Sequence, residues 1–175
     1  NLPPLSSMIA HDGPEKTLAW AKGFVKNFAR TPKGGDRDQI RAVAAGECDI
    51  AIANTYYMGQ LAKSSRASDR KAAETVKIYW PNQDGTGTHV NISGAGVTKA
   101  APNKANAIKL IEFLSGDAAQ KIYAESVNEY PIKPGVPASE IVASWGEFKA
   151  DDLPLSELGK YHAQALRIAD QAGWR

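Results

Sequence analysis

Two adjacent tyrosines, Tyr56 and Tyr57, are the residues of this chain best suited to a chemical role. A phenol loses its proton only near about pH 10, so a tyrosinate at neutral pH requires a highly charged metal ion that stabilises the anion. This hard oxygen donor matches a hard trivalent cation such as Fe³⁺ better than Zn²⁺ or Cu⁺. Adjacent tyrosines are also common as core or interface aromatics, so the pair alone leaves a packing role and a ferric site open.

The residues that catalyse hydrolysis or group transfer do not form a recognisable set in this chain. Its three histidines, His11, His89 and His162, lie in unrelated contexts, and no Gly-x-Ser-x-Gly motif is present. No His-Glu-x-x-His or Cys-x-x-Cys spacing predicts a zinc site, and Cys48 is the only cysteine. We therefore expect a binding protein and not an enzyme.

The composition is typical of a globular protein. Of the 175 residues, 43% are hydrophobic and 23% are charged, which places the chain well away from disordered sequences. No apolar run approaches the roughly 18 residues that a transmembrane helix needs. The formal net charge is +2 with the signs interspersed, so nucleic acid is not expected as a partner.

The tyrosines follow a predicted β-strand at residues 49–53, where isoleucine alternates with small and polar side chains. Tyr56 and Tyr57 would then lie just past the carboxyl end of a buried strand, where open α/β sheets bind their ligands. Two further strands are predicted at residues 77–80 and 89–98. Apolar residues at three- and four-residue spacing predict helices at 14–28, 37–45, 56–62, 103–114, 117–124 and 158–172. Strands and helices in this order predict an α/β fold.

The loop at residues 31–36 carries Gly34 and Gly35 immediately before a predicted helix. Glycines at this place serve a tight turn. They also let an anion approach the backbone N–H groups at the start of a helix, where the partial positive charge lies. The spacing alone leaves both interpretations open.

Three stretches of the chain resemble the periplasmic ferric-ion-binding proteins of bacterial iron ABC transporters. They are GGDRDQIRAVAAGECDIAIANTYY at residues 34–57, PNQDGTGTHVNISGAGV at 81–97 and the ending AGWR at 172–175. The resemblance extends over essentially the whole chain, and motifs of this length are specific.

The resemblance implies a type II periplasmic-binding-protein fold, with two lobes of mixed sheet and flanking helices. Such lobes close on Fe³⁺ by a hinge motion, and the periplasmic protein then delivers the ion to an ABC permease in the inner membrane. The resemblance also implies that Tyr56 and Tyr57 both coordinate iron. It implies that Asn54 holds a synergistic anion such as phosphate or carbonate, with the turn at Gly35 and Asp36 assisting. The remaining alternative is a type II binding protein for a small organic or phosphorylated anion.

The family members are longer than this chain, which resembles their C-terminal part. Residues 1–85, which carry the tyrosine pair, and residues 138–175 are expected to belong to the C-terminal lobe. Residues 86–137 are expected to cross into the N-terminal lobe. Without sheet partners this middle segment would expose an apolar face, so we expect either a missing N-terminal half or self-association to cover it.

Overall fold

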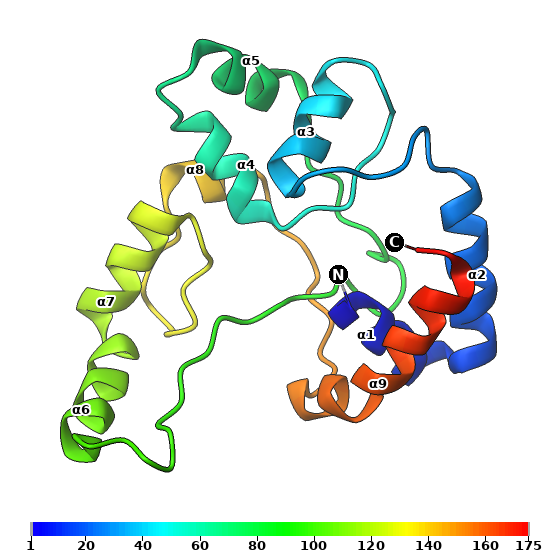
Figure 1. Cartoon of the computed structure of the whole chain (residues 1–175). Coiled ribbons are helices and arrows are strands. Elements are labelled where there is room, and N and C mark those ends of the chain that lie inside the picture. The colour runs from blue at the N-terminus through cyan, green and yellow to red at the C-terminus, as the bar shows by residue number, and fades with distance from the viewer. Residues whose placement is uncertain (1, 175) are drawn as a thin grey trace. The chain divides into compact units, whose positions relative to one another are not determined.

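The computed structural model describes residues 2–174 and is helical throughout its regular elements (Figure 1). The α-helices are α1 (Leu2–Asp12), α2 (Pro14–Lys26), α3 (Asp36–Ala44), α4 (Thr55–Ala62), α5 (Ala67–Thr75), α6 (Lys104–Leu114), α7 (Asp117–Ile122), α8 (Glu140–Ala143) and α9 (Leu155–Ala172), and a π-helical turn, η1 (Tyr123–Val127), follows α7. The six helices predicted from apolar spacing are confirmed as α2, α3, α4, α6, α7 and α9. None of these helices is long and apolar enough to cross a membrane within residues 2–174.

The predicted strands at residues 49–53, 77–80 and 89–98 are wrong for this structure, because no strand occurs among residues 2–174. The β-pairing in this part of the chain is one isolated parallel bridge between Thr88 and Ala150. A strand requires a neighbouring segment that completes its backbone hydrogen bonds. No described segment pairs with residues 49–53, and Ile50 is 82% exposed there. Residues 49–53 therefore have the alternating sequence of a strand but do not form part of a sheet.

The described chain divides into two compact units. The first comprises residues 2–33, 80–91 and 148–174, and the second comprises residues 34–79 and 92–147. The assignment of residues 1–85, 86–137 and 138–175 to the lobes of a larger protein stays a prediction.

Helices α1, α2 and α9 form the core of the first unit (Figure 1). Leu5 and Ile9 lie one turn apart on α1, and each is at most 3% exposed. They pack in one cluster with Ala165 and Ile168 of α9 and with Ala21 of α2. Fully burying a leucine or isoleucine side chain stabilises a fold by about 1.5–3 kcal/mol. The small alanines allow the helices to approach closely enough for this burial.

Helices α3, α4 and α5 form a platform in the second unit. Ile40 of α3 packs with Met58 and Leu61 of α4 in a buried cluster. An ion pair between Arg41 Nε and Asp69 Oδ1, 2.8 Å apart, connects α3 to α5. The start of α4, which carries the two tyrosines, is therefore supported by two neighbouring helices.

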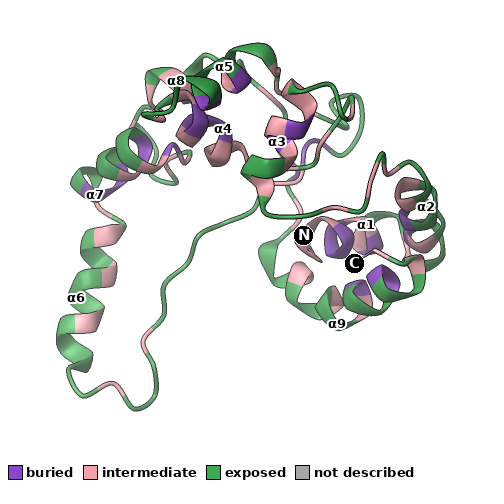
Figure 2. Ribbon diagram, turned by 45° about the horizontal axis from the view of Figure 1, so that its top comes forward, coloured by how far each residue is buried: buried purple, intermediate pink, exposed green. Residues whose placement is uncertain are grey.

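Helix α6 contrasts with the other long helices because none of its residues is buried (Figure 2). Ile108, Leu110 and Phe113 are 42%, 56% and 54% exposed. Leu110 and Phe113, three residues apart, lie on the same side of the helix. The expectation that another segment covers an apolar face of the middle segment stays a prediction.

Candidate metal centre

Tyr56 and Tyr57 lie in the first turn of α4. Asn54 is the N-cap of this helix with an extended backbone, φ −72° and ψ 138°, and its carbonyl accepts the backbone N–H of Tyr57 at 3.2 Å. Asparagine is a favoured N-cap residue. The chain therefore changes from extended to helical immediately before the tyrosines, as the sequence predicted for the end of the segment at residues 49–53.

The two phenol rings contact each other. Their centroids are 4.2 Å apart and their planes differ by 40°. Successive residues of a helix point about 100° apart, so contact between neighbouring rings requires both side chains to turn toward a common side. The rings meet at the turn that begins α4, and both side chains are only partly buried. Two phenol oxygens are thus available from one turn of helix.

The surroundings of Tyr56 favour a cation. A hydrogen bond with Tyr57, burial, and the negative charges of Asp36 and Glu129 raise the pKa of Tyr56 to about 12. The neutral phenol therefore dominates at neutral pH in the absence of a metal. The same negative charges that disfavour a bare phenolate attract a multiply charged cation. A trivalent ion would reverse the balance and allow the phenolate to form.

Asp36 and Asn54, which the sequence placed in an anion site with Gly35, are in direct contact. Asp36 Oδ2 accepts the backbone N–H of Asn54 at 2.8 Å and its side-chain amide at 3.2 Å. The backbone N–H of Gly35 donates to Asp38 Oδ2 at 2.9 Å. Asn54 and Gly35, two of the three residues expected at the anion site, thus already donate to carboxylates of this chain. Gly34 has φ +76°, and a Cβ there would collide with the Asp38 carboxylate, so this turn requires glycine.

Glu129 is the residue near the tyrosines that the sequence interpretation missed. It follows Asn128, which adopts the left-handed conformation and is 1% exposed. Asn128 lies against Gly59, which is one helical turn after Tyr56. Ser93 Oγ donates to Glu129 Oε1 at 2.9 Å. Only the left-handed asparagine gave a sequence signal, since asparagine tolerates this conformation better than other non-glycine residues.

A second polar cluster lies in the first unit and does not have the connectivity of a catalytic triad. The buried carboxylate of Asp151 accepts the Ser7 hydroxyl at 2.8 Å, and the His11 Nε2 atom lies 3.0 Å from both of its oxygens. The backbone N–H of Leu153 also donates to it at 3.1 Å. A hydrolytic triad needs the serine bound to the histidine. Here both bind the aspartate, so the cluster connects α1 to the segment before α9.

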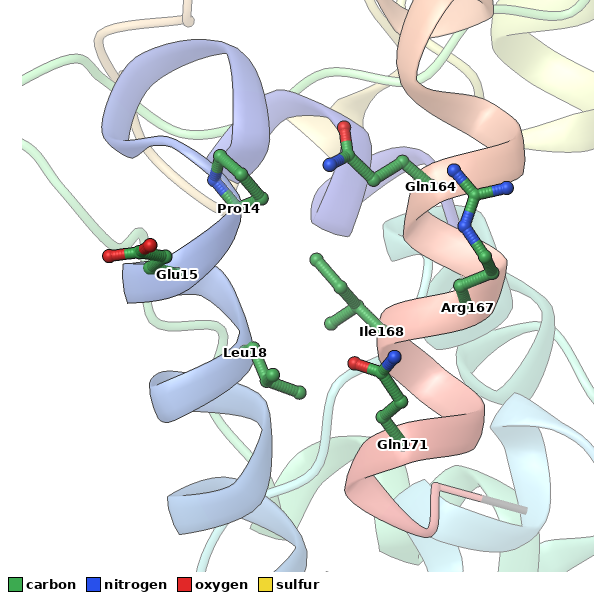
Figure 3. Close-up of a pocket in the computed structure, with 7 residues that line it drawn as sticks. All are labelled: Pro14, Glu15, Leu18, Gln164, Arg167, Ile168 and Gln171. Atoms are coloured by element: carbon green, nitrogen blue, oxygen red, sulfur yellow. The ribbon is translucent and has the colours of Figure 1, made fainter.

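A shallow pocket of about 170 Å³ lies between α2 and α9 (Figure 3). Its lining consists of Pro14, Glu15, Leu18, Gln164, Arg167, Ile168 and Gln171. None of these residues belongs to the site predicted from the sequence. Among residues 2–174 no group of three or more histidine, cysteine, aspartate or glutamate side chains is arranged to hold a metal ion.

Comparison with protein families and curated proteins gives consistent matches. The family model of bacterial extracellular solute-binding proteins matches residues 5–150. Iron uptake protein A1 of Synechocystis sp. is 52% identical over 171 residues, which cover 98% of this chain and 48% of that protein. The chain therefore spans about half the length of the curated relatives it matches.

Solved structures give the same result. A Trichodesmium protein, solved in complex with iron and citrate ligands, superposes with a TM-score of 0.94 at 48% identity and covers 100% of this chain and 55% of that one. A ferric binding protein from Campylobacter jejuni superposes with a TM-score of 0.97 at 43% identity and covers 99% of this chain and 55% of that one.

Proposed function

Because this chain belongs to the bacterial extracellular solute-binding proteins, a family of binding proteins and not of enzymes, we propose that it binds ferric iron through Tyr56 and Tyr57. The likeness to solved relatives gives the chain the periplasmic-binding-protein fold. The observation that carries the proposal is the ring contact of the two tyrosines at the start of α4. Relatives whose names describe them as ferric-iron-binding proteins add further support.

Iron binding at this pair is an exchange of protons for a metal ion. Each coordinating phenol releases its proton and supplies a hard anionic oxygen. Asp36 and Glu129, whose charges reach Tyr56, offset the positive charge that the two phenolates leave on a trivalent ion. Closure of two lobes would then exclude water, which strengthens every charge interaction at the site. Other ligands come from outside the tyrosine pair.

An anion such as phosphate or carbonate is proposed as the companion of the ion, held by Asn54, Gly35 and Asp36. In this arrangement the Asn54 amide and the Gly35 N–H bind carboxylates of the chain itself. An anion would therefore have to displace these hydrogen bonds or accept from another N–H of the same residues. The structure of the Trichodesmium relative holds citrate with its iron, so an organic carboxylate is a further candidate for the same role.

Membership of the solute-binding family supports two further proposals. The protein acts in the periplasm, and it delivers iron to an ABC permease in the inner membrane. The exposed Leu110 and Phe113 side chains of α6 support the companion proposal that another protein segment covers them. That segment is either an N-terminal half of the same protein or a second copy of this chain.

The direct test is the visible charge-transfer band of tyrosinate bound to iron. We expect a band when the purified protein receives a ferric chelate. We also expect the double variant Tyr56→Phe with Tyr57→Phe to lose it. Tyr79→Phe is the matched control, since Tyr79 is 85% exposed in the same unit and should leave the band unchanged. A double variant with an unchanged band contradicts the assignment.

A second candidate function is binding of a small organic or phosphorylated anion without iron. The Trichodesmium relative, which holds citrate together with iron, shows that a protein of this fold can accept an organic anion. Thermal unfolding separates the two candidates. A shift of the midpoint with citrate or phosphate esters, and none with ferric iron, would support the anion protein.

A further inference from the structure

The start of α4 is attached to α3 at two points, one polar and one apolar. Asp36 opens α3, and its Oδ2 atom accepts both the backbone N–H and the side-chain amide of Asn54. One turn further along α3, Ile40 is 4% exposed and packs with Met58 of α4. Residues four apart on a helix share one face. Asp36 and Ile40 on α3 therefore meet Asn54 and Met58 on α4 in matching register.

The contact between Asp36 and Asn54 replaces the usual local cap. An asparagine N-cap normally accepts a backbone N–H of the first helical turn with its side chain. The Asn54 side chain makes no such bond and instead donates to Asp36 at 3.2 Å. The first turn of α4 is thus oriented by a residue of another helix.

This orientation acts directly on the candidate ligands. Tyr56 and Tyr57 are two and three residues after Asn54, so a small rotation at Asn54 moves both phenol oxygens. Tyr57 also packs on the cluster of Ile40, Met58 and Leu61. The apolar cluster supports the base of the turn, and the Asp36 carboxylate fixes its beginning.

We propose that Asp36 is a positioning residue for the ferric site: by binding Asn54 it holds the two tyrosine side chains in the arrangement that coordinates iron. The inference rests on the proposed function. It assigns the Asp36 carboxylate a role through Asn54, in addition to the anion contact proposed for this turn.

Three substitutions separate position from charge. Asp36→Asn keeps an oxygen at the same place but removes the charge. Asp36→Glu keeps the charge but moves the oxygen by one methylene, and Asp36→Ala removes both. Asp38→Asn is the matched control, because Asp38 lies on the same helix and binds Gly35 and Arg41. The readouts are ferric affinity, by competition with a chelator, and hydrogen exchange of the backbone amides at 54–57.

We expect Asp36→Ala and Asp36→Glu to weaken ferric binding by about tenfold or more and to speed amide exchange at 54–57, since each loses a partly buried hydrogen bond to the helix start. Asp36→Asn keeps an acceptor oxygen for Asn54, so its amide exchange at 54–57 should stay within about threefold of the wild type, as in the Asp38→Asn control. Its loss of ferric affinity, which comes from the removed charge alone, should be clearly smaller than that of Asp36→Ala. Circular dichroism identifies any variant that fails to fold. If Asp36→Ala does not fold, Asp36→Glu is used in its place.

Two results would overturn the inference. One is Asp36→Ala and Asp36→Glu binding iron like the wild type. The other is a loss in Asp36→Asn as large as in Asp36→Ala, which would make charge and not position the cause. If the wild type itself shows no charge-transfer band, the proposed ferric function fails. The amide exchange of the same variants then still tests, without iron, whether Asp36 fixes the start of α4.

Discussion

Gly59 of α4 lies directly against Asn128, the left-handed residue that ends η1. A Cβ at residue 59 would be 2.5 Å from Asn128 Cγ and 2.6 Å from its Cβ. Asn128 is 1% exposed and has φ 60°. This close approach places the turn that carries Glu129 beside the helix that carries Tyr56.

Gly59→Ala should therefore destabilise the protein, although alanine is the better helix former. Overpacking a tight contact costs about 1–3 kcal/mol, whereas replacing a helical glycine by alanine gains about 1 kcal/mol. Gly23→Ala is the control, because a Cβ at this helical position meets nothing within 4 Å. It should stabilise by about 1 kcal/mol. Urea unfolding measures both, and equal shifts for the two variants would show that the Asn128 contact is unimportant.

Ferric binding should weaken as the pH falls. The pKa of Tyr56 is raised to about 12 by the hydrogen bond with Tyr57, burial and nearby negative charge, so at pH 7 this phenol must lose a proton when iron binds. Each displaced proton lowers the apparent affinity by about tenfold per pH unit of acidification. We expect proton release on iron binding in an indicator titration at pH 7. The variant Tyr56→Phe should release one proton fewer than the wild type. Proton-independent binding would exclude phenolate ligation.

Acid should destabilise the first unit through Asp151. Burial alone would raise the pKa of Asp151, but hydrogen bonds from Ser7, His11 and the Leu153 backbone lower it overall. A carboxyl group with a lowered folded-state pKa contributes stability that is present above its unfolded value, near about 3.9, and is lost as the pH falls through the folded value.

Asp151→Asn should therefore lower stability at pH 7 and reduce the further loss between about pH 5 and pH 2. Thermal unfolding of wild type and variant across this range gives the comparison. Asp152→Asn, at the neighbouring exposed residue, is the control and should follow the wild-type curve. A variant that loses stability with acid as steeply as the wild type would assign the acid sensitivity to other carboxyl groups.

The chain of 175 residues should self-associate when it is prepared alone. Leu110 and Phe113 of α6 are each more than half exposed, and a contiguous exposed apolar patch is a typical contact surface. The double variant Leu110→Lys with Phe113→Lys should shift the species toward the monomer in analytical ultracentrifugation. Lys109→Glu, on the same helix, should not. A wild-type chain that is monomeric at all concentrations would contradict this prediction.

Local patterns explain why the helices were predictable and the strands were not. The apolar spacing of α2 or α9 is a property of a few consecutive residues, and a helix completes its own hydrogen bonds. Residues 49–53 have a strand pattern, but a strand also needs a neighbouring strand to pair with, and the local sequence does not show which segment that is. The alternation of apolar and polar residues suggested that the isoleucines would be buried. Ile50 is exposed, so the pattern did not predict burial.

The candidate site was predictable in part for the same reason. Tyr56 and Tyr57 are adjacent, so a helix start between Asn54 and the pair was enough to bring the rings together. Asp36 and Asn54 were both selected as site residues, but their mutual hydrogen bonds depend on the packing of α3 against α4. Glu129 acts on Tyr56 from the turn that packs through Asn128 against Gly59, a contact that no local pattern reveals.

The parallel bridge between Thr88 and Ala150 has a consequence for the continuity of the chain. Thr88 donates its backbone N–H to the Lys149 carbonyl and accepts that of Asp151, each at 2.8 Å. Lys149 is bound a second time, by the Gln83 side chain. Hydrogen bonds therefore hold together the two ends of the segment between Thr88 and Lys149. A protease cut inside this segment should leave both fragments attached, so the nicked protein would behave as one molecule until it is denatured.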